Sequence, residues 1–302
     1  KRREGVVEGR KAFNNGLGYL NEVHNNYPAS FNMTNDITLE AWVKMANTSG
    51  NQTIITKFGD VVSDDAYVLQ AINGEPQFLL NFGPTWVSVA AGMTMNVNEW
   101  YHIVGVYNGA TMKIYVNGVE QNSIAQTGAF DVSASTFKIG GWSGAQHWNG
   151  SIDEVRVWNS ARTQTEIREN SHLTLLGSES NLVAYYQFNT DDPIGTANGV
   201  KDGLGLANGL TVNMPNTAYI ASEVAVAGGV SQTLTIPNVG PFTATYAAVG
   251  LEIEFGATTP NGEVVVSRLE TESPTGASSI TGQVDDEYFV IHNYGANASF
   301  TT

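Results

Sequence analysis

The stretch from Ile139 to Trp158 constrains the fold more than any other part of the chain. It begins at the end of a short strand-like run and continues with a glycine-rich loop. From Ile152 to Trp158 apolar and polar residues then alternate. Alternation of this kind sends successive side chains to opposite faces of a sheet. The stretch therefore predicts two strands that are joined by a loop.

Similar alternating runs recur along the first 190 residues. Asn-Gly pairs at 73–74, 108–109 and 117–118 follow three of these runs, and this dipeptide is a strong hairpin signal. Strands at this spacing without intervening helices predict an all-β fold, a two-sheet antiparallel sandwich. A capping box at 163–166 predicts one short helix. The runs lie at 37–45, 53–58, 66–72, 77–82, 85–91, 100–107, 112–116, 136–139, 152–158 and 182–188.

The sequence also predicts the domain organisation. Five of the 14 Lys and Arg residues fall within residues 1–11, which we expect to form a leader or arm. Residues 12–190 carry the sandwich pattern. Residues 191–220 are rich in Asp, Gly and Asn, and this composition predicts a loop or linker. Residues 221–302 predict a smaller β-sandwich module, which stops within a strand pattern, so we expect a fragment of a longer parent chain with other domains.

Charge and cysteine usage narrow the functional classes. The net charge of −15 repels phosphate backbones, so we expect no nucleic acid partner. No apolar run reaches the roughly 18 to 20 residues that cross a bilayer, so we expect no membrane insertion. The chain contains no cysteine, which excludes disulfides and thiolate sites and favours a bacterial secreted protein.

Six sequence elements, taken in order, resemble the laminin-G-like domains of the concanavalin-A-like lectin and glucanase superfamily. This resemblance implies a jelly-roll β-sandwich of a secreted or cell-surface protein. Residues 286–295 resemble part of the small β-modules that follow such sandwiches in secreted proteins of the Bacteroidetes. The six elements are Ile37–Val43, Ile54–Lys57, Glu99–Val104, Lys113–Gly118, Lys138–Gly141 and Gly150–Trp158.

The same superfamily includes retaining glucanases, which need two carboxylates about 5 Å apart. Family glucanases carry these groups at alternate positions of one strand. Here Ser151 stands where the nucleophile would be, and the adjacent Asp153 and Glu154 point to opposite faces of a regular strand. The sequence therefore predicts that the protein is not an enzyme, and a glycoside hydrolase is the third alternative.

Calcium is a second expectation from the resemblance, because sandwiches of this class often hold a structural calcium ion. Asp153 could supply a carboxylate and the backbone around Asn15 a carbonyl group. A second candidate is the acidic loop that contains Asp60, Asp64 and Asp65. A solvated acidic loop is the alternative interpretation of these three residues.

A sugar site needs exposed aromatic rings together with polar groups that bind hydroxyls. Trp142 is the leading candidate because it lies in a predicted loop, where no alternating pattern places its side chain in the core. Trp86, Gln146 and His147 could assist it. The other tryptophans are predicted to pack in the core or on the sheets, at positions 42, 100, 148 and 158. The sequence thus favours a non-catalytic module that recognises a glycan. A structural or adhesive spacer, or a protein-binding module, is the alternative.

Overall fold

A computed structural model describes residues 11–15, 19–22, 29–59, 64–141, 146–189, 200–212, 214, 218–270 and 287–297, with the first two segments described by their backbone. The chain divides into two compact units. The larger unit takes its described residues from 8–162 and 176–224, and the smaller unit takes its residues from 163–175 and 225–302.

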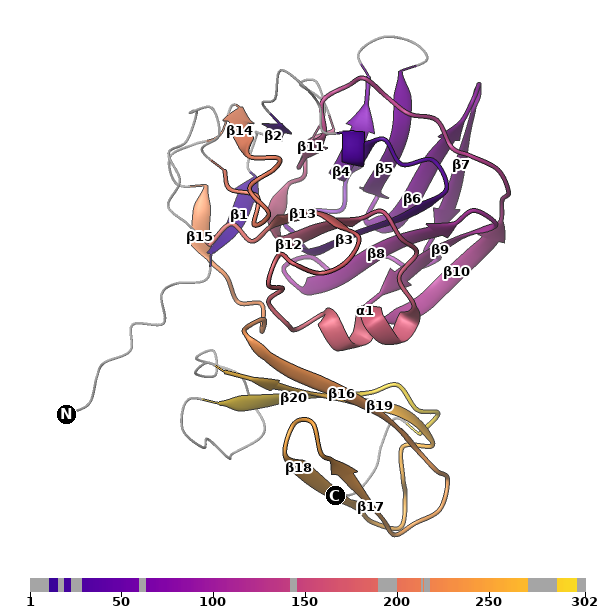
Figure 1. Cartoon of the computed structure of the whole chain (residues 1–302), viewed down its shortest axis with the longest axis vertical. Coiled ribbons are helices and arrows are strands. Elements are labelled where there is room, and N and C mark those ends of the chain that lie inside the picture. Colours follow the sequence, from indigo (N-terminus) through magenta and orange to yellow (C-terminus); the bar gives the residue numbers. More distant parts are fainter. Residues whose placement is uncertain are drawn as a thin grey trace, which may run out of the picture. The chain divides into compact units, whose positions relative to one another are not determined.

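The larger unit is a sandwich of two antiparallel sheets (Figure 1). Sheet A has the strand order β10-β9-β8-β3-β12-β1-β15, and β13 also pairs with β12. Its strands are β1 (Lys11–Asn15), β3 (Asp36–Met45), β8 (Trp100–Asn108), β9 (Thr111–Val116), β10 (Val119–Ala125), β12 (Gly150–Trp158), β13 (Leu182–Tyr186) and β15 (Tyr219–Ala221).

Sheet B packs against sheet A and has the order β14-β2-β11-β4-β5-β6-β7. A short 3-10 helix, η1 (Ala29–Phe31), precedes β3. The strands of sheet B are β2 (Tyr19–Glu22), β4 (Asn51–Phe58), β5 (Asp65–Ile72), β6 (Glu75–Phe82), β7 (Thr85–Ala90), β11 (Lys138–Ile139) and β14 (Gly209–Val212).

The core lies between the two sheets and follows the alternation of the sequence. In β3, Ile37 and Leu39 point inward and are 0% exposed, and they belong to one apolar cluster with Leu69 and Phe78 of sheet B. Each fully buried side chain of this size contributes about 1.5 to 3 kcal/mol through the hydrophobic effect. Trp148 joins the same cluster, as predicted. The predicted all-β sandwich is confirmed.

The segment that the sequence predicted as a linker contributes to the sandwich instead. In β14, Leu210 pairs with Asn21 of β2, and in β15, Ile220 pairs with Ala12 of β1. The larger unit therefore continues to Val224. These strands of three and four residues are too short for a periodic pattern, and backbone pairing with the existing sheets forms them.

The smaller unit contains the helix α1 (Gln164–Asn170), which begins directly after Thr163, the N-cap residue of the predicted capping box. The Thr163 hydroxyl accepts from the backbone N–H of Glu166, and the Glu166 carboxylate accepts from the backbone N–H of Thr163. The strands form a sheet with the order β16-β19-β20 and a β17–β18 hairpin over a separate apolar core. They are β16 (Gly229–Ile236), β17 (Phe242–Tyr246), β18 (Leu251–Phe255), β19 (Gly262–Leu269) and β20 (Tyr288–Asn293).

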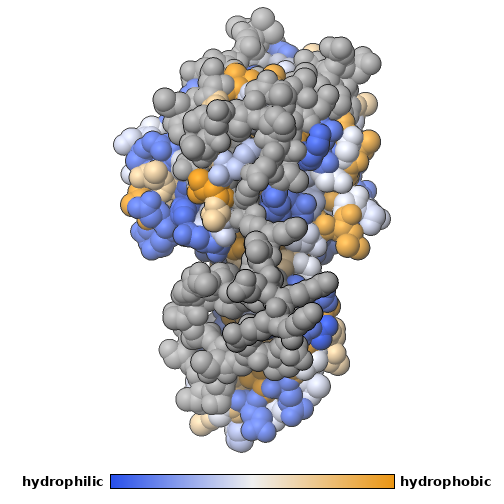
Figure 2. Space-filling view, turned by 90° about the vertical axis from the view of Figure 1, so that its left-hand side faces the viewer, coloured by the Kyte–Doolittle hydropathy of each residue, from blue (hydrophilic) through white to orange (hydrophobic). Residues whose placement is uncertain are grey.

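On the face shown in Figure 2, hydrophilic side chains surround smaller hydrophobic spots on the described surface. Such a mixed surface is ordinary for a folded domain.

Within the described part of the chain, no helix combines the length and the hydrophobicity that a membrane span requires.

Candidate functional site

A β-bulge in β4 decides which of its residues face away from the core. The register with β5 shifts between Thr53 and Ile55, and the consecutive Ile54 and Ile55 are both 0% exposed. Strict alternation would place Thr53 and Ile55 on the same face. The extra residue of the bulge instead places Thr53 on the outer face of sheet B together with Thr56 and Phe58.

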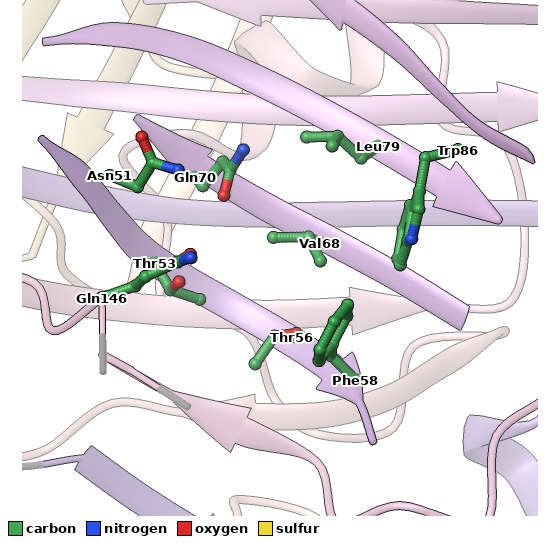
Figure 3. A pocket seen from close by; sticks show the side chains of 9 residues that line it. All are labelled: Asn51, Thr53, Thr56, Phe58, Val68, Gln70, Leu79, Trp86 and Gln146. Atoms are coloured by element: carbon green, nitrogen blue, oxygen red, sulfur yellow. The ribbon is translucent and has the colours of Figure 1, made fainter. Parts of the chain in front are cut away.

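The outer face of sheet B carries a hollow of about 300 Å³ over β4 to β7 (Figure 3). This volume lies at the lower end of the range for small-ligand sites. Aromatic rings stand at one end of the hollow and amide side chains gather at the other end. The lining residues are Asn51, Thr53, Thr56, Phe58, Val68, Gln70, Leu79, Trp86 and Gln146.

Phe58 and Trp86 form the aromatic end. Their rings are stacked, with the centroids 5.6 Å apart and an interplanar angle of 22°. Burial raises the pKa of Asp65, and hydrogen bonds from the Gly59 backbone N–H and the Trp86 side chain partly offset this effect. Both aromatic rings are half-buried, so each keeps exposed surface beside the hollow.

The amide end offers hydrogen-bonding groups that have no partner among the described residues. The side chains of Asn51 and Gln70 form no hydrogen bond with another described residue, although Gln70 is only 6% exposed. The hydroxyl of Thr53 is buried and, among the described residues, has no partner. Gln146 is anchored by its backbone, because its carbonyl accepts from the Thr53 N–H at 2.8 Å. Unused polar groups of this kind are suited to bind a polar ligand.

Two of the residues that the sequence proposed for ligand binding line this hollow. Trp86 and Gln146 come from opposite sides of it and lie at its two ends (Figure 3). His147 is half-buried and is not among the lining residues. Trp142, the leading candidate, lies outside the described residues, so its role stays a prediction.

Other lining residues were missed by the sequence reasoning. Phe58 and Gln70 lie within strands, where an alternating pattern predicts a sheet without telling which face is hollowed. The two consecutive isoleucines before Thr56 were the available signal of the bulge, because a regular strand cannot bury both on one face.

Asp64 and Asp65 of the acidic loop accept hydrogen bonds from nearby backbone N–H groups. Asp64 accepts from the Ala134 backbone N–H and from the Ser135 hydroxyl, each at 2.6 Å. Burial raises the pKa of Asp64, but these hydrogen bonds outweigh it, so the net pKa is lowered. Asp60 lies outside the described residues. The interactions of Asp64 tie the start of β5 to the segment before β11.

Asp153 is also engaged with the protein. Its side chain is 0% exposed, and its two oxygens accept from the Glu154 backbone N–H at 2.8 Å and the Ser222 hydroxyl at 2.5 Å. Asn15 pairs with Gly150, three residues along β12 from Asp153. Among the described residues, no three histidine or carboxylate side chains lie close enough to hold a metal ion. Because calcium also takes backbone and amide carbonyl oxygens as ligands, a calcium ion near Asp153 stays a prediction.

A buried group of charged side chains lies on the face of sheet A opposite the core. Glu40 is 2% exposed, and Glu154 and Arg156 are each 1% exposed. Arg156 Nη2 lies 3.0 Å from Glu154 Oε2, and Arg156 Nη1 lies 3.8 Å from Glu40 Oε1. The Trp158 indole N–H donates to Glu40 at 2.7 Å, and His102 Nε2 lies 3.2 Å from Glu40 Oε2. This network joins β3, β8 and β12.

The network keeps the Glu40 carboxylate charged. Burial alone would raise the pKa of Glu40, but the hydrogen bond from His102 and the charge of Arg156 outweigh burial and lower the pKa to about 2. The Tyr185 hydroxyl donates to Glu154. Because Glu40 and Glu154 are enclosed and paired with Arg156, they do not present an acid and a nucleophile to a sugar. Their contacts give them a structural role.

A two-sheet sandwich with one hollowed outer face defines the larger unit as a jelly-roll β-sandwich domain. Residues 19–168 match the Laminin_G_3 family of the concanavalin A-like lectin/glucanases superfamily. The resemblance predicted from the six sequence elements is therefore confirmed for this domain.

Mouse pappalysin-1 is 24% identical to this chain over 149 residues, which span 43% of this chain and 9% of pappalysin-1. A provisionally assigned carbohydrate binding protein from Bacteroides ovatus superposes with a TM-score of 0.58 and 22% identity, covering 72% of this chain and 62% of that chain. A sialidase domain of Ruminococcus gnavus, CBM40 bound to α2,3 sialyllactose, superposes with a TM-score of 0.43 and 14% identity over 52% of this chain and 92% of that chain.

Proposed function

We propose that the larger unit is a non-catalytic carbohydrate-binding module of a secreted or cell-surface protein, and that its glycan binds in the hollow of sheet B. The observation that carries this proposal is the stacked pair Phe58 and Trp86 at one end of a groove whose other end holds unused amide groups. A sugar ring has the same two-sided chemistry, with apolar C–H groups on its faces and hydroxyls around its rim.

Each end of the hollow matches one part of such a ligand. The exposed aromatic surface can pack against the C–H groups of a sugar face, and this packing removes apolar area from water. The amides of Asn51, Gln70 and Gln146 can both donate to and accept from hydroxyls. The B. ovatus neighbour, described as carbohydrate binding, supports this choice of ligand.

The groups that line the hollow favour binding over catalysis. Among the described lining residues there is no carboxylate, whereas glycoside hydrolysis requires a pair of them. The hydroxyls and amides of the lining are not general acids or bases near neutral pH. We therefore propose that the domain retains glycans and does not cleave them.

A binding screen tests this function directly. The full chain is run through native gels that contain single neutral polysaccharides, including galactomannan, mixed-linkage β-glucan, arabinan and xylan, and thermal melts are recorded with the same polymers. We expect at least one polymer to retard migration and to raise the Tm, because a ligand that binds only the folded state stabilises it.

The screen also separates the alternatives. Release of reducing sugar from the retained polymer would contradict the non-catalytic assignment. Absence of retardation with every polymer of the screen would favour the spacer. Parallel melts with calcium and with a chelator test the calcium prediction, since a bound ion must raise the Tm by the same linkage.

A further inference from the structure

The two ends of the hollow lie far apart along the strands. Trp86 of β7 pairs with Asn81 of β6, and Gln70 of β5 pairs with Gln77 of β6. The row of the aromatic end and the row of the amide end are therefore four residues apart on β6. At a rise of about 3.4 Å per residue, this separation is about 13 Å.

The second aromatic residue is displaced in the same direction. Phe58 of β4 pairs with Asp65, five residues before Gln70 in β5, whereas Thr53 pairs with Gln70 itself. Both aromatic side chains thus lie at least four residues along the strands from the unpartnered groups of the amide end. A single sugar ring is too short to contact both ends at once, whereas two or three linked rings cover the distance.

The floor between the two ends is mainly aliphatic. Val68 of β5 pairs with Thr56 of β4 and with Leu79 of β6, and all three line the hollow, with Val68 between the amide and the aromatic side chains (Figure 3). The Thr56 hydroxyl already donates to the Tyr67 carbonyl oxygen. Lys138 of β11 continues this row beside Thr56 but is not among the lining residues. The floor therefore offers a sugar chain an apolar surface and no further amides.

We infer that the hollow holds an oligosaccharide segment of about three sugar residues that lies along β4 and β5, and this inference rests on the proposed function. One ring packs on Phe58 and Trp86, and the next ring lies over Val68. The third ring places its hydroxyls against Gln70 and Gln146. A monosaccharide can occupy only one of these three positions.

The length of the ligand decides how many of these contacts act together. Each added ring removes further apolar surface of the hollow from water, and this contribution grows with the buried area. Linked rings also share one loss of translational and rotational freedom, so the second and third contacts form at a lower cost. Rings beyond the lining residues contribute little. The affinity should therefore rise until the hollow is filled and then level off.

A series of oligosaccharides of increasing length tests this inference. Linear oligosaccharides of one to six mannose, glucose, arabinose or xylose residues match the backbones of the polymers in the screen, and each is titrated into the full chain by calorimetry. In the series whose parent polymer is retained, we expect the trisaccharide to bind at least about a hundredfold more tightly than the monosaccharide. Lengthening from three to six residues should change the affinity less than about threefold.

Variants at the two ends give the second arm. Trp86→Ala removes an aromatic ring from one end, and Thr53→Val removes a hydroxyl from the other end while it keeps the shape of the side chain. The trisaccharide should lose affinity in both variants, by about fivefold or more, because it contacts both ends. The monosaccharide should lose affinity in at most one variant. Gln121→Ala removes an exposed amide from β10 of sheet A and should leave both affinities unchanged.

The outcomes distinguish this inference from the proposed function. Equal affinity for the monosaccharide and the trisaccharide, or loss of monosaccharide binding in both variants, would show a site for one ring; it would overturn the inferred length and leave the carbohydrate-binding function standing. A steady rise in affinity up to six residues would also overturn the inferred length. Failure of every polymer and oligosaccharide to bind overturns both. A rise that ends at about three residues, with trisaccharide binding weakened in Trp86→Ala and Thr53→Val but not in Gln121→Ala, supports both.

Discussion

Phe58 and Trp86 stack with their ring centroids 5.6 Å apart, although β5 and β6 separate the strands that carry them. The two side chains therefore reach toward one another over the intervening strands and close one end of the hollow (Figure 3). Contact between the rings restricts the rotamers of both. A ligand that packs on this pair then loses little entropy to ordering side chains, which favours binding.

Trp86→Ala should lower the affinity for the retained polysaccharide about tenfold to a hundredfold, because aromatic anchors carry a large share of binding energy. Trp100→Ala is the matched control. Trp100 is also half-buried in the larger unit, but it contacts Lys44 and Glu223 at the sheet A side of the sandwich. Isothermal titration calorimetry measures both variants. Similar losses in the two variants would remove Trp86 from the site.

Thr53→Val should change stability and binding in opposite directions. The Thr53 hydroxyl is buried without a partner among the described residues, so its replacement by a methyl group of similar size should leave the free energy of unfolding unchanged or raise it by about 1 kcal/mol. Affinity for the polysaccharide should fall about fivefold to tenfold, since one hydrogen bond to the ligand is lost.

Thr56→Val is the control for that experiment. The Thr56 hydroxyl lies 3.4 Å from the carbonyl oxygen of Tyr67, to which it donates, so its loss should destabilise the protein by roughly 0.5 to 1 kcal/mol. Urea unfolding measures the stability of both variants. If Thr53→Val destabilises the fold as Thr56→Val does and leaves binding intact, the hydroxyl of Thr53 has a structural role only.

The buried network of Glu40 predicts a loss of stability in acid. The pKa of Glu40 is lowered from its ordinary value of 4.5 to about 2 in the folded state, so the unfolded chain binds the proton more readily. The stabilisation is complete above pH 4.5 and is lost as the pH falls toward 2. A difference of this size corresponds to about 3 kcal/mol.

The variant Glu40→Gln isolates this contribution. It should destabilise the larger unit by about 3 to 5 kcal/mol at neutral pH, because Arg156 loses one of its buried partners. It should also reduce the loss of unfolding free energy at acid pH. Tryptophan fluorescence during urea unfolding at a series of pH values measures this loss. A loss as large as that of the unmodified protein would assign the pH dependence to other carboxylates.

Alternation in the sequence was sufficient to predict the main strands and the core face of β3, because a two-residue period leaves one face apolar. It also located the hairpins, where Asn73 and Asn117 both adopt a φ of 49° and the following glycine is also left-handed. The short strands β14 and β15 were not predictable, because three or four residues carry no period. Their position depends on pairing with β2 and β1, which lie far away in the sequence.

The candidate site was predictable only in part, for a related reason. Trp86 and Gln146 stand out because each follows a glycine-containing turn, where side chains are often exposed. Gln70 sits within an apolar strand, and nothing in its local pattern tells a groove residue from a solvated one. Its role emerges only when the bulge in β4 brings Thr53 opposite to it on the same face.

The smaller unit carries its own pH-sensitive contact, between His172 and His292. Their Nε2 atoms lie 2.8 Å apart and their rings stack with centroids at 4.8 Å. His172 Nδ1 lies 2.6 Å from the Ala225 carbonyl oxygen, so it donates there, and its Nε2 is left to accept from His292. Protonation of both rings would leave the His292 N–H without an acceptor and would place two cations in contact. Burial also lowers the pKa of His292.

The smaller unit should therefore lose stability as the pH falls below the ordinary histidine value of 6.5, because the unfolded chain binds the proton that the folded unit rejects. A pKa difference of one corresponds to about 1.4 kcal/mol, or roughly 6 to 11 °C in Tm for a domain of this size. All six tryptophans fall at positions 42 to 158, within the larger unit, so fluorescence does not follow this change. Amide hydrogen exchange of β16 and β19, corrected for intrinsic rates at about pH 7.5 and about pH 5.5, measures it.

His292→Gln keeps a donor toward His172 without a titratable ring and should abolish the pH difference. Equal protection of the unmodified protein at both pH values, or the same pH difference in the variant, would show that this histidine pair does not control the stability of the unit.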